Sequence, residues 1–289
     1  MKKIAVGLLF ALPLFATVHV AAAYPYIGEL TKMIAGDKAD VRVIATASSD
    51  PHFVTPRPSY IGILHTSDLL ILNGGGLEIG WMPPLLSQAN NPKIIQDAEG
   101  YLDLSKYVKL IDKPTSLSRA QGDVHAEGNP HYSLDPLVIP SLAKVIMLKL
   151  SAIDPANKTS YVNNYNGFAK RWSEKLVQWN SAMTPCKNTD VVQYHDYFSY
   201  FLNRFGIHTV ATIEPLPGIS PSSKHTMEVI SRIRNEKIPL IVQDDYHESK
   251  TAQFMAEKSG ARSVILPHDA SAGSLEKWFD TLVAQTCQR

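Results

Sequence analysis

The chain has 289 residues, of which 45% are hydrophobic and 19% are charged, and its formal net charge is +1. This composition is ordinary for a globular protein, and the length is sufficient for two domains. Because the charge is nearly balanced, it gives no support to a nucleic acid or an anionic membrane surface as partner.

The first sixteen residues have the pattern of a secretory signal peptide. Lys2 and Lys3 precede an apolar run, residues 4–15, that contains no charge. The run is shorter than the roughly 20 apolar residues of an uncleaved membrane anchor. Cleavage near Ala16 and cleavage after Ala23 both remain open. We favour Ala16, because residues 17–23 alternate as in a strand and lead into a helix.

Strands and helices alternate through the first half. The pattern predicts strands at about residues 17–23, 39–46, 69–73 and 93–96, and helices at 25–35, 58–65 and 81–88. A further strand is expected around Val108. Asp154 and Pro155 have the residue types of a helix start. From there to Met183, apolar side chains recur every three or four positions, which predicts one long helix with an apolar face.

The second half repeats the alternation. Strands are predicted near residues 189–194, 208–213, 239–243 and 262–267, with helices after Asp196, Ser222, His247 and Ser274. The whole pattern predicts an α/β fold of two Rossmann-like lobes joined by a long, rigid connecting helix. We expect an N-terminal lobe of residues 17–153, a connecting helix of residues 154–184 and a C-terminal lobe of residues 185–289.

The chain has two cysteines, Cys186 and Cys287. In an exported protein they are expected to form a disulfide that closes a loop of about 100 residues, worth on the order of 4 kcal/mol. A metal-binding or redox pair is the alternative, but such pairs normally need close spacing. Because neither cysteine lies near the signal peptide, we expect a soluble periplasmic protein without a lipid anchor.

Three histidines and one aspartate follow predicted strands or the loops after them: His52, His131, His195 and Asp269. In open α/β sheets, ligands bind outside the carboxyl ends of the strands, so these four side chains are predicted to meet in the cleft between the lobes. Three imidazoles and one carboxylate suit a tetrahedral zinc ion. Manganese and iron remain alternatives, although they generally prefer more oxygen ligands.

The fourth ligand is the least certain member of this set. His268 is adjacent to Asp269, and residues 244–248 form another loop with acidic residues and a histidine after a strand. His125 and Glu127, in the loop before His131, either hand over metal transiently or belong to a solvated loop.

Several motifs together resemble the solute-binding proteins of zinc and manganese ABC transporters, closest to the periplasmic zinc-binding branch. They are Asp-Pro-His at residues 50–52 followed by Pro-Arg-Pro-Ser at 56–59, residues 67–74, Gly-Asn-Pro-His-Tyr-Ser-Leu-Asp-Pro at 128–136, Tyr-His-Asp-Tyr-Phe at 194–198, and residues 214–222. Each fragment alone is weak. Their shared order and spacing over nearly the whole mature chain make the resemblance strong.

The resemblance implies two α/β lobes, one metal ion in the cleft at the four positions above, and delivery of that ion to a membrane permease. Histidine at position 195 is similar to the zinc-associated pattern of the family. In the manganese-binding relatives, glutamate stands at this position. Many zinc-binding relatives carry a long histidine-rich loop before the second ligand, and this chain has only His125 and Glu127 in a short stretch. The sequence around Asp269 is also an imperfect match.

We therefore expect the high-affinity zinc-binding component of an ABC metal importer, without enzymatic activity, that captures Zn²⁺ as cargo. The expected partners are a cognate permease in the inner membrane and a periplasmic metallochaperone, and the expected state is a monomer. A manganese- or iron-binding transport protein of the same fold is the alternative. A secreted zinc-dependent hydrolase is less well supported, because the sequence has no His-Glu-x-x-His motif.

Overall fold

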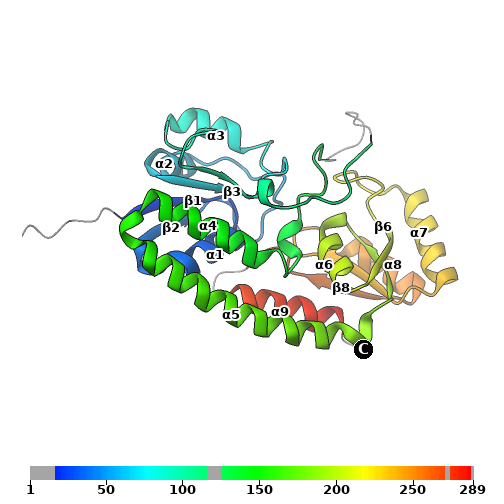
Figure 1. Ribbon diagram of the computed structural model, residues 1–289. Coiled ribbons are helices and arrows are strands. Elements are labelled where there is room, and N and C mark those ends of the chain that lie inside the picture. Colours follow the sequence, from blue (N-terminus) through cyan, green and yellow to red (C-terminus); the bar gives the residue numbers. More distant parts are fainter. Residues whose placement is uncertain (1–16, 116–124, 271–273, 288–289) are drawn as a thin grey trace, which may run out of the picture.

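Two four-stranded parallel sheets form the two halves of the molecule (Figure 1). The computed structural model describes residues 17–115, 125–270 and 274–287. The predicted signal peptide, residues 1–16, lies outside the described residues. Within them, no helix is both long enough and apolar enough to cross a membrane.

The N-terminal sheet has the strand order β2-β1-β3-β4. Its strands are β1 (Val18–Ala22), β2 (Ala39–Val43), β3 (Leu69–Leu72) and β4 (Tyr101–Asp103), and its helices are α1 (Pro25–Ala35), α2 (Pro58–Thr66), α3 (Met82–Ala89) and α4 (Ile139–Ile153). Every residue of β3 is apolar and buried, as expected for a central parallel strand covered on both faces. All four helices have proline in their first turn, where its missing N–H costs no hydrogen bond.

The C-terminal sheet repeats this arrangement with the order β6-β5-β7-β8. Its strands are β5 (Asp190–Gln193), β6 (His208–Thr212), β7 (Leu240–Asp244) and β8 (Arg262–Leu266), and its helices are α6 (Ser199–Arg204), α7 (Ser223–Glu236), α8 (Lys250–Ser259) and α9 (Leu275–Thr286). Ser222 and Ser274 cap α7 and α9, because each side chain accepts a hydrogen bond from a backbone N–H of the first turn. The α/β fold with two Rossmann-like lobes is therefore confirmed.

The long helix α5 (Lys158–Met183) contacts both halves of the molecule. It packs against α1 and α4 of the N-terminal half and runs beside α9 of the C-terminal half (Figure 1). The rings of Trp172 and Trp179 both pack against Phe279 of α9. The predicted connecting helix and its apolar face are thus present, whereas the lobe boundaries at residues 153 and 185 stay predictions.

The start of this helix differs from the expected one. A 3-10 turn, Pro155–Asn157, precedes α5. The carboxylate of Asp154 accepts hydrogen bonds from the side chains of Asn157 and Tyr161, both at 2.7 Å, and makes no capping bond to a backbone N–H. Asp154 therefore stabilises the start of the helix through hydrogen bonds with side chains and not by capping the backbone.

The predicted disulfide joins the ends of two packed helices. Cys186 follows α5 and Cys287 follows α9, and their Cα atoms are 5.8 Å apart. The bond holds the last helix of the chain against the connecting helix.

Two expectations for the first half are wrong, and one helix was not predicted. Residues 93–96 form turns instead of a strand, because the carbonyl of Lys93 accepts the N–H of Gly100 within a loop, and β4 pairs with β3 instead. No strand lies around Val108, which follows the 3-10 turn Leu104–Tyr107. Helix α4 was not among the predicted elements, although Leu142, Ile146 and Leu150 have helical spacing and are buried.

Candidate metal-binding site

Three of the four predicted ligands lie together between the two halves of the molecule. His52 comes from the loop after β2, His131 immediately precedes a 3-10 turn, and His195 is the second residue after β5. One nitrogen of each ring lies within 4.8 Å of the other two, and all three side chains are buried. The long loop to His131 brings a second N-terminal imidazole to the carboxyl end of the C-terminal sheet.

The spacing of the three rings suits a shared metal ion. Imidazoles that bind zinc at about 2.1 Å and at tetrahedral angles have ring centroids about 5.2 Å apart. The centroids are 5.2 Å apart for His52 and His131, 5.4 Å for His52 and His195, and 5.4 Å for His131 and His195. All three pairs are close to this distance.

A carboxylate orients His52. Asp50 Oδ1 lies 2.9 Å from His52 Nδ1 and also accepts the backbone N–H of His52 at 2.9 Å. Burial raises the pKa of Asp50, but its hydrogen bonds with His52 outweigh this effect and the pKa is lowered. An Nδ1–H held by a carboxylate leaves the Nε2 lone pair for a metal. That Nε2 is buried and has no hydrogen-bond partner among the described residues.

A second carboxylate orients His195. Glu214 Oε2 lies 2.8 Å from His195 Nδ1, while His195 Nε2 lies 3.4 Å from His131 Nε2 and 3.1 Å from Asp196 Oδ1. Burial lowers the pKa of His195, but Glu214 and Asp196 outweigh it and the pKa is raised. Burial likewise raises the pKa of Glu214, but hydrogen bonds with His195 and His247 lower it to about 2. Glu214 is therefore a charged partner that holds the ring of His195.

His131 is held by different contacts. Its backbone N–H donates to Asn129 Oδ1 at 2.9 Å, and its ring stacks on Tyr197 with centroids 3.9 Å apart. Its Nδ1 is buried without a hydrogen-bond partner in the described part of the chain. Burial, followed by the charges of neighbouring histidines, lowers the pKa of His131 well below its usual value. The ring is therefore neutral and able to donate a lone pair.

The supporting contacts were not predicted. Asp50 and Glu214 both lie in motifs that the sequence singles out, but their role as partners of ring nitrogens needs the folded chain. The hydrogen bond to Glu214 spans nineteen residues and joins two loops at the carboxyl end of the C-terminal sheet.

Asp269 lies outside the group of three histidines. Its Oδ1 accepts the backbone N–H of Tyr26 at 2.8 Å, in the first turn of α1, and that of Ala270 at 2.5 Å. Burial raises the pKa of Asp269 to about 7. In this structure its carboxylate connects the C-terminal half to a helix of the N-terminal half. Its role as the fourth ligand stays a prediction.

The alternative fourth ligands are also held by other groups. His268 Nδ1 pairs with Asp245 Oδ1 at 2.5 Å, and His268 Nε2 lies 3.2 Å from the carbonyl oxygen of Ser49. His247 Nδ1 pairs with Asp244 at 2.9 Å. Neither histidine belongs to the group of three.

His125 lies next to the group, whereas Glu127 does not. The ring of His125 is 5.3 Å from that of His52. Burial lowers the pKa of His125 to about 3. A cavity of about 160 Å³ adjoins it, lined by Asp112, His125, Gly128, Asn129, Pro130, His195, Asp196 and Pro217. Glu127 Oε1 instead lies 3.7 Å from Lys106 Nζ.

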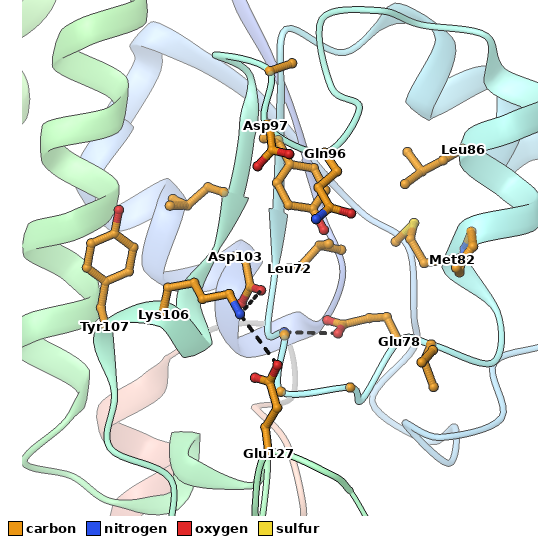
Figure 2. A pocket seen from close by; sticks show the side chains of 18 of the residues that line it. Leu72, Glu78, Met82, Leu86, Gln96, Asp97, Asp103, Lys106, Tyr107 and Glu127 are labelled. Carbon is orange, nitrogen blue, oxygen red and sulfur yellow. Dashed lines mark hydrogen bonds and ion pairs between the residues drawn. The ribbon is translucent and has the colours of Figure 1, made fainter.

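A larger cavity of about 580 Å³ lies in the N-terminal half, at the carboxyl ends of β3 and β4. Figure 2 shows Lys106 reaching toward both Asp103 and Glu127. Glu78 Oε2 accepts the backbone N–H of Gly74 at 3.0 Å. Burial raises the pKa of Glu78 to about 8. None of the three histidines lines this cavity, so it is separate from the candidate metal site.

Comparison with known proteins gives one family match along most of the chain. The family model described as ZnuA, zinc-uptake complex component A, periplasmic, matches residues 20–288. The zinc-binding lipoprotein AdcA of Streptococcus pneumoniae (strain ATCC BAA-255 / R6) is 22% identical to this chain over 247 residues. These residues are 86% of this chain and 49% of AdcA, so the chain spans about half the length of that relative.

Two further similarities concern a manganese protein and a solved structure. The manganese ABC transporter substrate-binding lipoprotein PsaA of Streptococcus anginosus is 25% identical over 76% of this chain and 70% of its own length. A crystal structure of ZnuA superposes with a TM-score of 0.74 at 20% identity, covering 93% of this chain and 96% of that one. This last similarity supports the two-lobed fold.

Proposed function

We propose, from the premise that the chain belongs to the ZnuA family of metal ABC transporter substrate-binding proteins, that it captures Zn²⁺ and delivers it to a membrane permease. We place this capture in the periplasm, after export by the predicted signal peptide. The ion is cargo, and the protein performs no catalysis on it.

One observation carries the choice of zinc: three buried imidazoles meet at distances suited to one tetrahedral ion. Zinc is well matched by neutral imidazole ligands, whereas manganese generally prefers more oxygen donors and higher coordination. Carboxylates hold the Nδ1 atoms of His52 and His195, which favours ligation through Nε2. We assign His52, His131 and His195 as ligands on this basis.

Manganese is the second candidate, and Asp196 is the observation that favours it. Its carboxylate oxygen lies 3.1 Å from His195 Nε2, so a shift of this side chain would add an oxygen donor beside the histidines. Asp269 would add another through Oδ2, because the N–H groups of Tyr26 and Ala270 both bond to Oδ1.

Competitive metal titration tests the proposal. Chelator-stripped protein at neutral pH is titrated with Zn²⁺ and Mn²⁺, and bound metal is counted by native mass spectrometry. We expect one tightly bound zinc that manganese does not displace. His195→Ala should weaken zinc binding at least about tenfold, while His208→Ala, whose ring is exposed on β6, should not. Preferential manganese binding would contradict the zinc assignment.

A further inference from the structure

His125 is the histidine beside the candidate site to which the proposed function gives no role. Its ring centroid lies 5.3 Å from that of His52 and 6.3 Å from that of His131. Its Nε2 is buried, and no hydrogen-bond partner for it exists among residues 17–115, 125–270 and 274–287. A buried ring nitrogen that faces no protein acceptor or donor is available to a ligand.

The backbone holds His125 close to the site. The N–H of Gly128 donates to the carbonyl oxygen of His125 at 3.2 Å, and the N–H of Asn129 donates to that of Ile111 at 2.8 Å. The same short segment continues into His131. His125 is therefore anchored by the turn that also carries an assigned ligand.

The surroundings leave room for the ring to approach the ion. A Cβ atom added at Gly76 would lie 3.3 Å from His125 Nδ1, so this glycine leaves space for the imidazole. On another side, the cavity of about 160 Å³ is lined by both His125 and His195.

His125 is outside the group of three histidines whose nitrogens lie within 4.8 Å of one another, so its ring must move toward them. Two imidazoles on one tetrahedral zinc ion have centroids about 5.2 Å apart. The ring of His125 already meets this distance to His52, and the distance to His131 exceeds it by about 1 Å. The adjoining cavity gives space for a shift of this size.

We infer, on the basis of the proposed function, that His125 supplies a fourth imidazole to the bound zinc ion. The ligand set is then four nitrogens, from His52, His125, His131 and His195, and Asp269 keeps its hydrogen bond to α1. Three of the four come from the N-terminal half. Four nitrogen donors further disfavour manganese, which prefers oxygen.

X-ray absorption at the zinc edge counts imidazole ligands directly. The measurement uses zinc-loaded mature protein, together with His125→Asn and the control His208→Asn. The zinc-free proteins are first compared by thermal unfolding, to confirm that the variants fold. We expect four imidazoles in the parent and in His208→Asn, and three in His125→Asn. Chelator competition should show zinc binding at least about tenfold weaker in His125→Asn only.

The outcomes separate the two claims. A parent protein that binds zinc through three imidazoles, with an affinity unchanged in His125→Asn, would overturn the role of His125 and leave zinc capture standing. If the number of oxygen ligands then falls on changing Asp196 or Asp269 to asparagine, that carboxylate is the fourth ligand. A parent protein that binds no zinc would overturn the proposed function and this inference together.

Discussion

The two halves of the molecule share one sheet order but surround the candidate site differently. The N-terminal half contributes His52 and His131, and at His131 burial lowers the pKa and Nδ1 has no hydrogen-bond partner in the described part of the chain. The C-terminal half contributes His195, whose partner Glu214 also pairs with His247 at 3.5 Å. The N-terminal side thus includes one imidazole without a carboxylate partner, His131, whereas His195 on the C-terminal side belongs to a charged network.

This difference gives the two sides separate tasks. On the N-terminal side, the lowered pKa of His131 means that its ring offers a lone pair without first losing a proton. On the C-terminal side, the raised pKa of His195 means that a proton competes with the metal. Metal binding therefore uses one ligand that is already neutral, His131, and one that must first lose a proton, His195.

The largest expected effect comes from a feature of the C-terminal half, its covalent connection to α5. Replacing Cys186 and Cys287 by serine should lower the free energy of unfolding by about 4 to 5 kcal/mol, since the disulfide closes a loop of about 100 residues. Zinc affinity should stay near that of the parent. Urea unfolding of the zinc-free proteins measures the first quantity and chelator competition the second. Unchanged stability would contradict the structural role of the bond.

Removal of a neutral ligand has the next largest effect. His131→Ala should weaken zinc binding at least about a hundredfold, more than the usual loss of an outer hydrogen-bond partner. Isothermal titration with a competing chelator measures this. His65→Ala is the matched control, because the ring of His65 contacts the carbonyl oxygen of Ala89 at 2.8 Å, away from the site. Equal affinities for both variants would remove His131 from the ligand set.

The carboxylate partners allow a direct comparison of the two sides. Glu214→Gln and Asp50→Asn should each weaken zinc binding about tenfold, because each leaves a ligand ring less firmly oriented. The Glu214→Gln protein should lose more, since this carboxylate is buried and bonds His195, His247 and the N–H of Gly218. The same titration serves both variants. A larger loss for Asp50→Asn would reverse the proposed division of tasks.

The smallest expected effect is a change in pH dependence. Because the pKa of His195 is raised above 6.5, zinc affinity should fall as the pH decreases through that raised pKa, by up to about tenfold per pH unit for one proton. His131, with a lowered pKa, should add nothing in this range. In Glu214→Gln the decline should begin at lower pH. Titrations between pH 8 and 5.5 test this, and an unshifted profile would exclude Glu214 as the cause.

The sequence predicted most elements because their patterns are local. Proline in the first turn marks α1 to α3, and apolar residues at helical spacing mark α5. The strand expected at residues 93–96 failed for a non-local reason. Ile94 is buried within a loop, Ile95 is exposed, and pairing with β3 is made by Tyr101–Asp103.

For the site, the sequence by itself determined that His52 and His195 follow strands, and hence that they lie at strand ends. The strand expected before His131, around Val108, is absent, so the place of His131 beside them depends on the fold. Only the tertiary structure decided which groups contact them. Glu214 pairs with Nδ1 of His195, and Tyr197 stacks on the ring of His131. The structure also decided that Asp269 accepts a hydrogen bond from the first turn of α1. The reason is physical. Strand ends follow from periodicity along the chain, whereas hydrogen-bond partners and ring spacings depend on how separate loops pack, which no local pattern encodes.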